Sequence, residues 1–130
     1  MTNKIILINV RELIAHEKVD IPHAIFIYLK MIFTRRFDFP ILVDARTKII
    51  LDGHHRCYAA NRLGLRLVPC FMVDYLNDPS ITVSSRRINI AVDKEIVVRM
   101  GLSEGVFPQK TTRHKYKISS FQPVELSELR

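Results

Sequence analysis

The chain has 130 residues, of which 48% are hydrophobic and 25% charged. These proportions are those of ordinary globular proteins, and they exclude an intrinsically disordered chain. The 20 Lys and Arg residues outnumber the 13 Asp and Glu residues, so the net charge is +7. This excess favours an anionic partner, such as nucleic acid, a nucleotide or a phosphorylated metabolite.

No segment resembles a targeting sequence or a membrane span. The first ten residues contain one lysine and a short apolar run that Asn9 interrupts, and no apolar stretch reaches the roughly 18 residues that cross a bilayer. Cys57 and Cys70 have no CxxC partner, so we expect both to be reduced and partly buried. These features predict a cytoplasmic protein with a single domain over residues 1–130.

The first third of the chain predicts a strand followed by a helix. Residues 4–13, "KIILINVREL", are β-rich. A helix is expected over residues 21–36, because Asp20 suits an N-cap, Pro22 suits the first turn, and Arg35 and Arg36 suit the end. Its interior is apolar nearly all round, which predicts a largely buried helix.

The remaining elements alternate between strands and helices. Short strands are predicted at Ile41–Val43 and Ile49–Leu51, around the turn-like "DARTK", and a helix over His54–Leu63 has Gly64 in its C′ position. Later segments are, in order, a strand at 65–76, a β-like stretch at 81–92, a helix at 93–105 capped by Asp93, and an extended tail with a short terminal helix. This order predicts an α+β domain with a mixed β-sheet and three or four helices.

An unusual polar cluster, Asp52–Gly53–His54–His55–Arg56, lies where a predicted strand meets a predicted helix. Gly53 permits a sharp turn, the free N–H groups of the helix suit a phosphate, and Arg56 and the histidines could donate hydrogen bonds to it. Asp52 could hold Mg²⁺ against that phosphate. The alternative is that Asp52 only caps the helix while the histidines face solvent. Zinc is disfavoured, because adjacent helical histidines point apart.

Two further segments carry groups that could take part in chemistry. Glu17, in "AHEKV", could act as a general base if folding brings it beside Asp52, although a lone loop glutamate is usually solvated. Residues 107–114, "FPQKTTRH", combine hydroxyls, cations and a histidine, which suits an anion clamp. An ordinary basic loop would have the same composition.

Residues 43–75, "VDARTKIILDGHHRCYAANRLGLRLVPCFMVDY", resemble the core of the ParB/sulfiredoxin superfamily, in which a strand delivers a G-x-x-R turn into a helix. Within it the chain is most similar to the free serine kinases, which carry an H-E pair, D-G-H-H-R and K-T-T-R-H. These motifs occur here in the same order, at His16–Glu17, residues 52–56 and residues 110–114. The resemblance implies a ParB/sulfiredoxin-like fold.

The resemblance also implies an activity, the phosphorylation of free L-serine to O-phospho-L-serine with Mg²⁺ and ATP or ADP. It implies that Glu17 is the base and that Asp52 assists it or organises Mg²⁺. The transferring phosphate would be held by Gly53, His54, His55 and Arg56. The serine or phosphoserine would be held by Lys110, Thr111, Thr112, Arg113 and His114.

Rival functions follow from the same fold. A sulfiredoxin needs a cysteine where this chain has His54. A ParB-like DNA-binding or regulatory protein suits the net charge of +7, but no helix-turn-helix segment follows the core, and residues 53–56 read G-H-H-R where ParB proteins have G-E-R-R. The basic residues are scattered and Trp is absent, so a continuous nucleic-acid surface is not visible.

Overall fold

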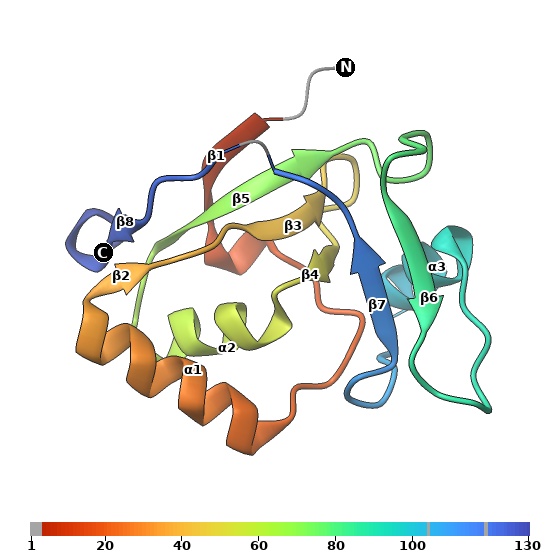
Figure 1. Ribbon diagram of the computed structural model, residues 1–130, viewed down its shortest axis with the longest axis horizontal. Coiled ribbons are helices and arrows are strands. Elements are labelled where there is room, and N and C mark those ends of the chain that lie inside the picture. Colours follow the sequence, from red (N-terminus) through yellow and green to blue (C-terminus); the bar gives the residue numbers. More distant parts are fainter. Residues whose placement is uncertain (1–3, 104, 119) are drawn as a thin grey trace.

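A four-stranded mixed sheet forms the centre of the computed structural model, which describes residues 4–103, 105–118 and 120–130 (Figure 1). Its strands lie in the order β1 (Lys4–Asn9), β5 (Leu67–Val73), β3 (Ile41–Asp44) and β4 (Ile50–Asp52). β3 and β5 are parallel, whereas β1–β5 and β3–β4 are antiparallel. The predicted α+β class and mixed sheet are confirmed.

β3, β4 and β5 are buried on both faces of the sheet, to which alternate side chains of each strand point, whereas β1 is largely exposed. Ile41 and Val43 belong to an apolar cluster that also includes residues of α1 (Ile21–Thr34) and α2 (His54–Arg62). Leu42 belongs to a second cluster, which contains Val97 of α3 (Lys94–Leu102). α1 and α2 lie side by side on one face (Figure 1).

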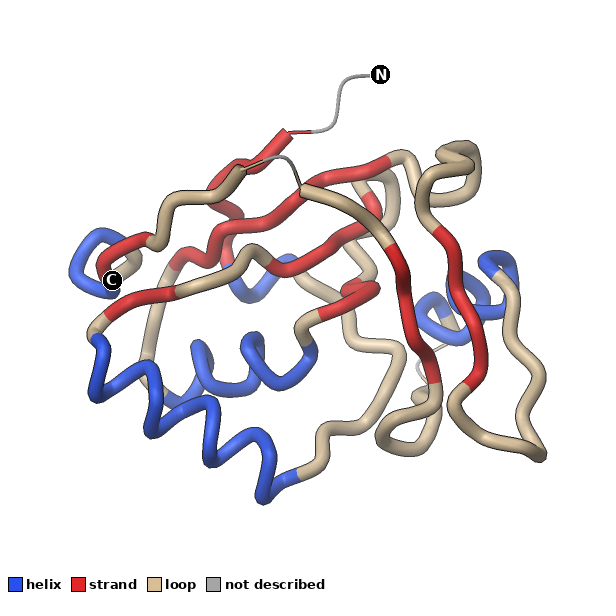
Figure 2. Tube along the Cα trace, in the orientation of Figure 1, coloured by secondary structure: helices blue, strands red, loops and turns tan. Residues whose placement is uncertain are grey.

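Two small two-stranded sheets and two 3₁₀ turns complete the fold. β6 (Thr82–Ser85) pairs antiparallel with β7 (Thr112–Lys115), and β2 (Arg36–Phe37) pairs with β8 (Val124–Glu125). The turns are η1 (Val10–Glu12) and η2 (Leu126–Glu128). The loop from η1 to α1 passes between β4 and β7 (Figure 2), and this passage positions the candidate site.

Several local predictions are confirmed. The side chain of Asp93 accepts a hydrogen bond from the Ile96 N–H and caps α3. Gly64 follows α2 with a φ of 71°, as a C′ glycine does. Residue 104, within the predicted helix 93–105, lies outside the described residues. α1, at 14 residues the longest described helix, is too short to cross a bilayer, and no other described helix could span one.

The prediction that α1 is largely buried is wrong. Ala24 and Met31 are its buried residues, whereas Phe26 is 64% and Phe33 90% exposed. The helix lies at the side of the molecule and contacts α2 along one stripe, and no other described element covers its outer face. An apolar sequence therefore does not by itself bring a helix into the core.

Of two other sequence predictions, the N-cap position of Asp20 is confirmed and the extent of one strand needs correction. Asp20 occupies the N-cap of α1 but makes no capping hydrogen bond, and its carboxylate pairs with Lys110 Nζ at 3.1 Å instead. The β-like stretch 81–92 is a strand only at β6, because the Ser85 hydroxyl donates to Arg87 O and accepts from Arg87 N–H. These local bonds turn the chain away from an extended path.

Both cysteines are buried and free, as the sequence predicts. Cys57 lies on α2 and Cys70 on β5, and both belong to the helix-side cluster. Burial raises the pKa of the Cys57 thiol to about 11 and that of Cys70 to about 12. Both side chains therefore serve as small apolar groups in the core.

Close packing of α3 against the sheet gives a first prediction. A Cβ at Gly101 would lie 2.6 Å from Ile49 Cδ1 and 2.8 Å from Ile49 Cγ1, and Ile49 is fully buried. We expect Gly101→Ala to lower the free energy of unfolding by about 1–2 kcal/mol, because overpacking outweighs the helix preference of alanine. Urea unfolding measures this change. Arg99→Ala, at an exposed position of α3, is the control and should stay within about 0.5 kcal/mol of the wild type.

A partly buried histidine gives a second prediction. His114 Nε2 lies 2.8 Å from the Tyr75 hydroxyl, and burial above all, with a contribution from His16, lowers the pKa of His114 to about 4. An unfolded histidine titrates near 6.5, so below that pH the unfolded chain binds a proton that the folded chain does not. The free energy of unfolding should therefore fall between pH 6.5 and about 4. In His114→Gln this fall, measured by urea unfolding at pH 7 and 4.5, should be smaller by about 2 kcal/mol; an equal fall in both proteins would contradict the assignment.

Candidate functional site

The polar cluster predicted from the sequence lies where β4 ends and α2 begins. Gly53 forms the turn with a φ of 108°, a conformation that favours glycine. A Cβ there would lie 2.9 Å from Arg56 Nη2, so glycine also permits the arginine to fold back over the turn. No side chain caps α2. Its first N–H groups are therefore not used by a cap and can meet an anion.

The two histidines of the cluster are held by backbone N–H groups. His54 Nε2 accepts from the His16 N–H at 3.2 Å, and His55 Nε2 accepts from the Asp20 N–H at 3.0 Å. Burial lowers the pKa of both rings, that of His54 well below its usual value. Each neutral ring therefore carries its proton on Nδ1 and can act as a donor. The alternative in which Asp52 caps the helix and both histidines face solvent is wrong, since Asp52 makes no cap and His54 is buried.

Glu17 is buried and is surrounded by donors from residues 110–112. Its Oε1 accepts from the Thr111 N–H (3.2 Å), the Thr112 N–H (2.8 Å) and the Thr112 hydroxyl (2.8 Å). Its Oε2 accepts from the Lys110 N–H at 3.1 Å. The sequence offered a solvated glutamate as the alternative. The structure instead places this carboxylate inside the protein, with four hydrogen bonds that compensate for lost water.

Asp52 is more open than Glu17 and is held through one oxygen. The Tyr116 hydroxyl donates to Asp52 Oδ2 at 2.5 Å, and Arg56 Nη2 lies 3.8 Å from the same atom. Burial and the neighbouring carboxylate raise the pKa of Tyr116, so its hydroxyl remains a donor. Because both contacts go to Oδ2 and the side chain is 47% exposed, Asp52 can present an oxygen to a ligand.

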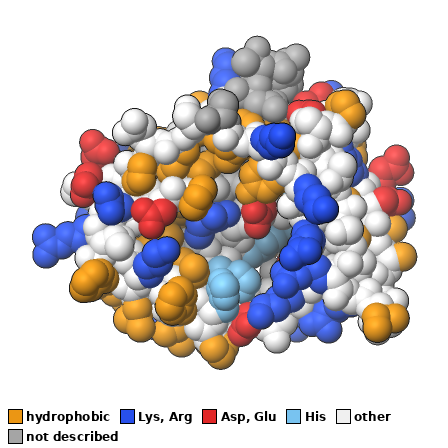
Figure 3. Space-filling view, in the orientation of Figure 1, with side chains coloured by type: hydrophobic (Ala, Val, Ile, Leu, Met, Phe, Trp, Pro, Cys, Tyr) orange, Lys and Arg blue, Asp and Glu red, His pale blue; other side chains and the backbone are white. Residues whose placement is uncertain are grey.

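A cavity of about 280 Å³ opens at the N-terminus of α2 and collects most of the predicted residues. In Figure 3 histidine side chains lie in a hollow at the centre of this face, with Lys and Arg side chains along its right-hand side. The lining comprises Glu17, His23, Leu51, Asp52, Gly53, His54, His55, Arg86, Lys110 and Thr112. The structure thus brings together the three motifs that are far apart in the sequence.

Four predicted residues do not line this cavity. Arg56 lies beside a separate cavity of about 90 Å³ against α1. The Thr111 hydroxyl donates to Pro108 O, and His114 contacts Tyr75. Arg113 is exposed on β7, because alternate residues of a strand point to opposite sides.

Two lining residues, His23 and Arg86, were not singled out from the sequence. His23 lies in the first turn of α1, and Arg86 follows β6 and donates its N–H to Thr111 O. Neither belongs to a recognisable motif, so only the fold reveals them. Arg86 and Lys110 place positive charge beside the helix N-terminus, which suits a phosphate.

The accessible carboxylate of Asp52 fits the role of one ligand to a magnesium ion. Mg²⁺ typically uses one or two carboxylates together with waters and substrate phosphates, so a single accessible aspartate is enough. Among the described residues no group of three or more His, Cys, Asp or Glu could hold a metal by itself.

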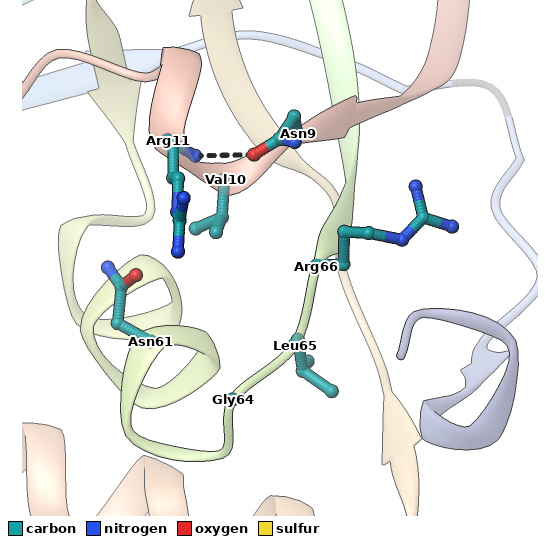
Figure 4. Close-up of a pocket in the computed structure, with 7 residues that line it drawn as sticks. All are labelled: Asn9, Val10, Arg11, Asn61, Gly64, Leu65 and Arg66. Carbon is teal, nitrogen blue, oxygen red and sulfur yellow. Dashed lines mark hydrogen bonds between the residues drawn. The ribbon is translucent and has the colours of Figure 1, made fainter.

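A second hollow, of about 440 Å³, lies at the other end of α2 (Figure 4). It is bordered by Arg11, Asn61 and Arg66, and in Figure 4 the Arg66 side chain points away from the other two. None of the predicted site residues lines it. The cavity at the N-terminus of α2 is therefore the candidate functional site.

Two curated proteins resemble part of the sequence, while no protein-family model matches it. A ParB-like protein of Sulfolobus acidocaldarius is 46% identical over 57 residues, which are 44% of this chain and 28% of that protein. An ATP-dependent L-serine kinase of Desulfurococcus mucosus is 33% identical over 76 residues, which are 55% of this chain and 30% of that protein. The match thus spans less than a third of either relative.

Solved structures match the chain over nearly its full length. A free serine kinase in complex with AMP superposes with a TM-score of 0.85 at 15% identity, covering 97% of this chain and 93% of that one. SbnI of Staphylococcus aureus, with a C-terminal truncation, gives 0.76 at 12% identity, covering 97% and 89%. The chain therefore has the ParB/sulfiredoxin-like fold that free serine kinase and SbnI share.

Proposed function

We propose that this chain is a small-molecule kinase that transfers a phosphoryl group from ATP or ADP to the hydroxyl of free L-serine, giving O-phospho-L-serine. One observation carries the proposal. A buried carboxylate, an uncapped helix N-terminus and two basic side chains converge on one cavity. The relatives support it, since the Desulfurococcus mucosus protein is an ATP-dependent L-serine kinase and a structural neighbour is a free serine kinase in complex with AMP.

The phosphate of the donor would lie at the start of α2. The N–H groups of its first turn and the Nδ1–H groups of His54 and His55 are donors, and Arg86 adds a guanidinium. Mg²⁺, held by Asp52, supplies charge neutralisation on the phosphates when it is bound. Phosphoryl transfer depends mainly on such positioning and charge neutralisation, which this arrangement provides.

Glu17 would take the proton from the serine hydroxyl. Its Oε2 accepts one hydrogen bond, from Lys110 N–H, and therefore retains capacity to accept another proton. Its Oε1 is held by three donors, which fix the carboxylate in place. A general base needs this combination of a fixed position and a free lone pair.

The serine would lie in the cavity beside Glu17. Lys110 and Thr112 line the cavity, and the ammonium group of Lys110 can contact the carboxylate of the serine. The motif also implies contacts from Thr111, Arg113 and His114. These contacts stay a prediction, and none of the three residues lines the cavity. A cytoplasmic location also stays a prediction.

The activity is tested directly by incubating the folded protein with L-serine, Mg²⁺ and either ATP or ADP. We expect O-phospho-L-serine with at least one donor, detected by mass spectrometry or phosphorus NMR. L-Threonine and L-homoserine serve as controls for the alcohol. Failure of both donors with folded protein would refute the proposal. Salt-sensitive retention of duplex DNA by the same preparation would then favour the ParB-like alternative.

Replacing the proposed base gives a sharper prediction. Glu17→Gln should lower kcat by about 10²- to 10⁴-fold, because the amide cannot accept the serine proton. Glu12→Gln, at an exposed glutamate five residues earlier, is the matched control and should leave kcat unchanged. Steady-state kinetics with L-serine measure both. Turnover by Glu17→Gln within a few-fold of the wild type would remove Glu17 from this role.

A further inference from the structure

The Thr112 hydroxyl has one hydrogen and two possible acceptors. Its oxygen lies 2.8 Å from Glu17 Oε1 and 3.1 Å from His16 Nε2. A hydroxyl can donate to one of these atoms at a time. The three side chains are buried, so water does not readily take the place of the missing donor.

The position of the His16 proton follows from its other contact. His16 Nδ1 lies 2.6 Å from Ile50 O, and a carbonyl oxygen only accepts, so Nδ1 carries the hydrogen. Burial lowers the pKa of His16, which keeps the ring neutral. A neutral ring with its hydrogen on Nδ1 has a lone pair on Nε2, directed at the Thr112 hydroxyl.

Glu17 needs the Thr112 hydroxyl in only one of its two protonation states. As a carboxylate, its Oε1 carries negative charge and accepts all three nearby donors. As a neutral acid protonated on Oε2, its Oε1 is a carbonyl oxygen with two lone pairs. The N–H groups of Thr111 and Thr112 satisfy those two lone pairs, which leaves the hydroxyl free to donate elsewhere.

We propose that His16 is a positioning residue for the base, and that the Thr112 hydroxyl turns from Glu17 to His16 when Glu17 becomes protonated. The inference rests on the proposed function. In the reaction, the serine O–H bond breaks, an O–H bond forms at Glu17 Oε2, and the serine oxygen bonds to the transferred phosphorus as the bond to the nucleotide breaks. No covalent bond changes at Thr112 or His16. Only the direction of one hydrogen bond changes.

This exchange keeps every buried polar atom of the trio satisfied after the proton has moved. Without His16, the hydroxyl of Thr112 would have no second acceptor and would oppose protonation of Glu17. Hydrogen bonds to charged groups are worth about 1.5–3 kcal/mol, which corresponds to about 10- to 100-fold in rate. The arrangement therefore acts on kcat rather than on the binding of serine.

A matched pair of variants tests the kinetic part. Thr112→Ser keeps the hydroxyl, whereas Thr112→Val removes it at similar volume, and both keep the backbone N–H that binds Glu17. We expect His16→Phe, which removes the second acceptor, to lower kcat by about 10- to 100-fold with little change in the KM for serine. Adding Thr112→Val to His16→Phe should restore kcat, because no hydroxyl then opposes protonation of Glu17, whereas adding Thr112→Ser should not. Equal kcat in the two double variants would overturn the proposal.

Nitrogen-15 NMR of histidine-labelled protein tests the hydrogen bond without any substrate. The charged and titratable groups near His16 are Glu17, His54 and His114. Burial lowers the pKa of His16 and of the two neighbouring histidines, so spectra at pH 7.5 report neutral rings. We expect His16 to carry its proton on Nδ1. In Glu17→Gln, whose neutral amide stands in for the protonated acid, the Nε2 resonance should move upfield as it accepts the hydroxyl.

The controls separate this proposal from the proposed function. The upfield movement should vanish in the double variant Glu17→Gln/Thr112→Val, since the donor is gone. An unchanged Nε2 resonance in Glu17→Gln, or a proton found on Nε2, would overturn the hydroxyl exchange. An observed exchange in a protein that phosphorylates no serine would uphold the hydrogen-bond switch and refute the proposed function instead.

Discussion

The carboxylate of Glu17 binds the backbone of residues 110–112, and the whole site depends on this interaction. It joins segments that are 93 to 95 residues apart, and it does so with an ionised group inside the protein. Such a group is tolerated only when donors replace the lost water, and three successive N–H groups and a hydroxyl provide them. These bonds attach the segment that leads into β7 to the loop before α1, and both border the cavity.

The same loop is fixed on its other side by the central sheet. Ile14 pairs with Ile49 next to β4, and Phe107 pairs with Glu17, so residues 14–18 are held between two neighbours. β4 then leads directly into Gly53 and α2. Because β4, the loop and β7 are held together, Glu17, Asp52 and the N-terminus of α2 have fixed relative positions. Preorganisation of this kind is what phosphoryl transfer requires.

Much of this arrangement could be predicted from local sequence. The strand, glycine turn and helix around "LDGHHRCYAANRLG" follow from short-range rules. The three sequence motifs predicted Glu17, Asp52 and Lys110 as site residues. What escaped prediction depends on neighbours distant in sequence. The alternation of β7 turns Thr112 inward and Arg113 outward, and that register is set by pairing with β6.

The exposed face of α1 and the role of Arg86 illustrate the same point. Hydrophobic composition predicted a buried helix, but a side chain is buried only where another element packs against it. α1 packs mainly against α2, so its other side stays exposed. Arg86 has no motif, and its place in the cavity follows from the hydrogen bond between its N–H and Thr111 O. Both features depend on tertiary contacts between residues distant in sequence, so no short segment of the sequence predicts them.

The burial of Cys57 and Cys70 has a chemical consequence. With pKa values raised to about 11 and about 12 by burial, both thiols stay almost entirely protonated at pH 7. The thiolate is the species that alkylating agents and oxidants attack, so both sulfhydryls are nearly inert while the core is intact. A thiol-directed reagent added to this protein therefore measures how often the core opens.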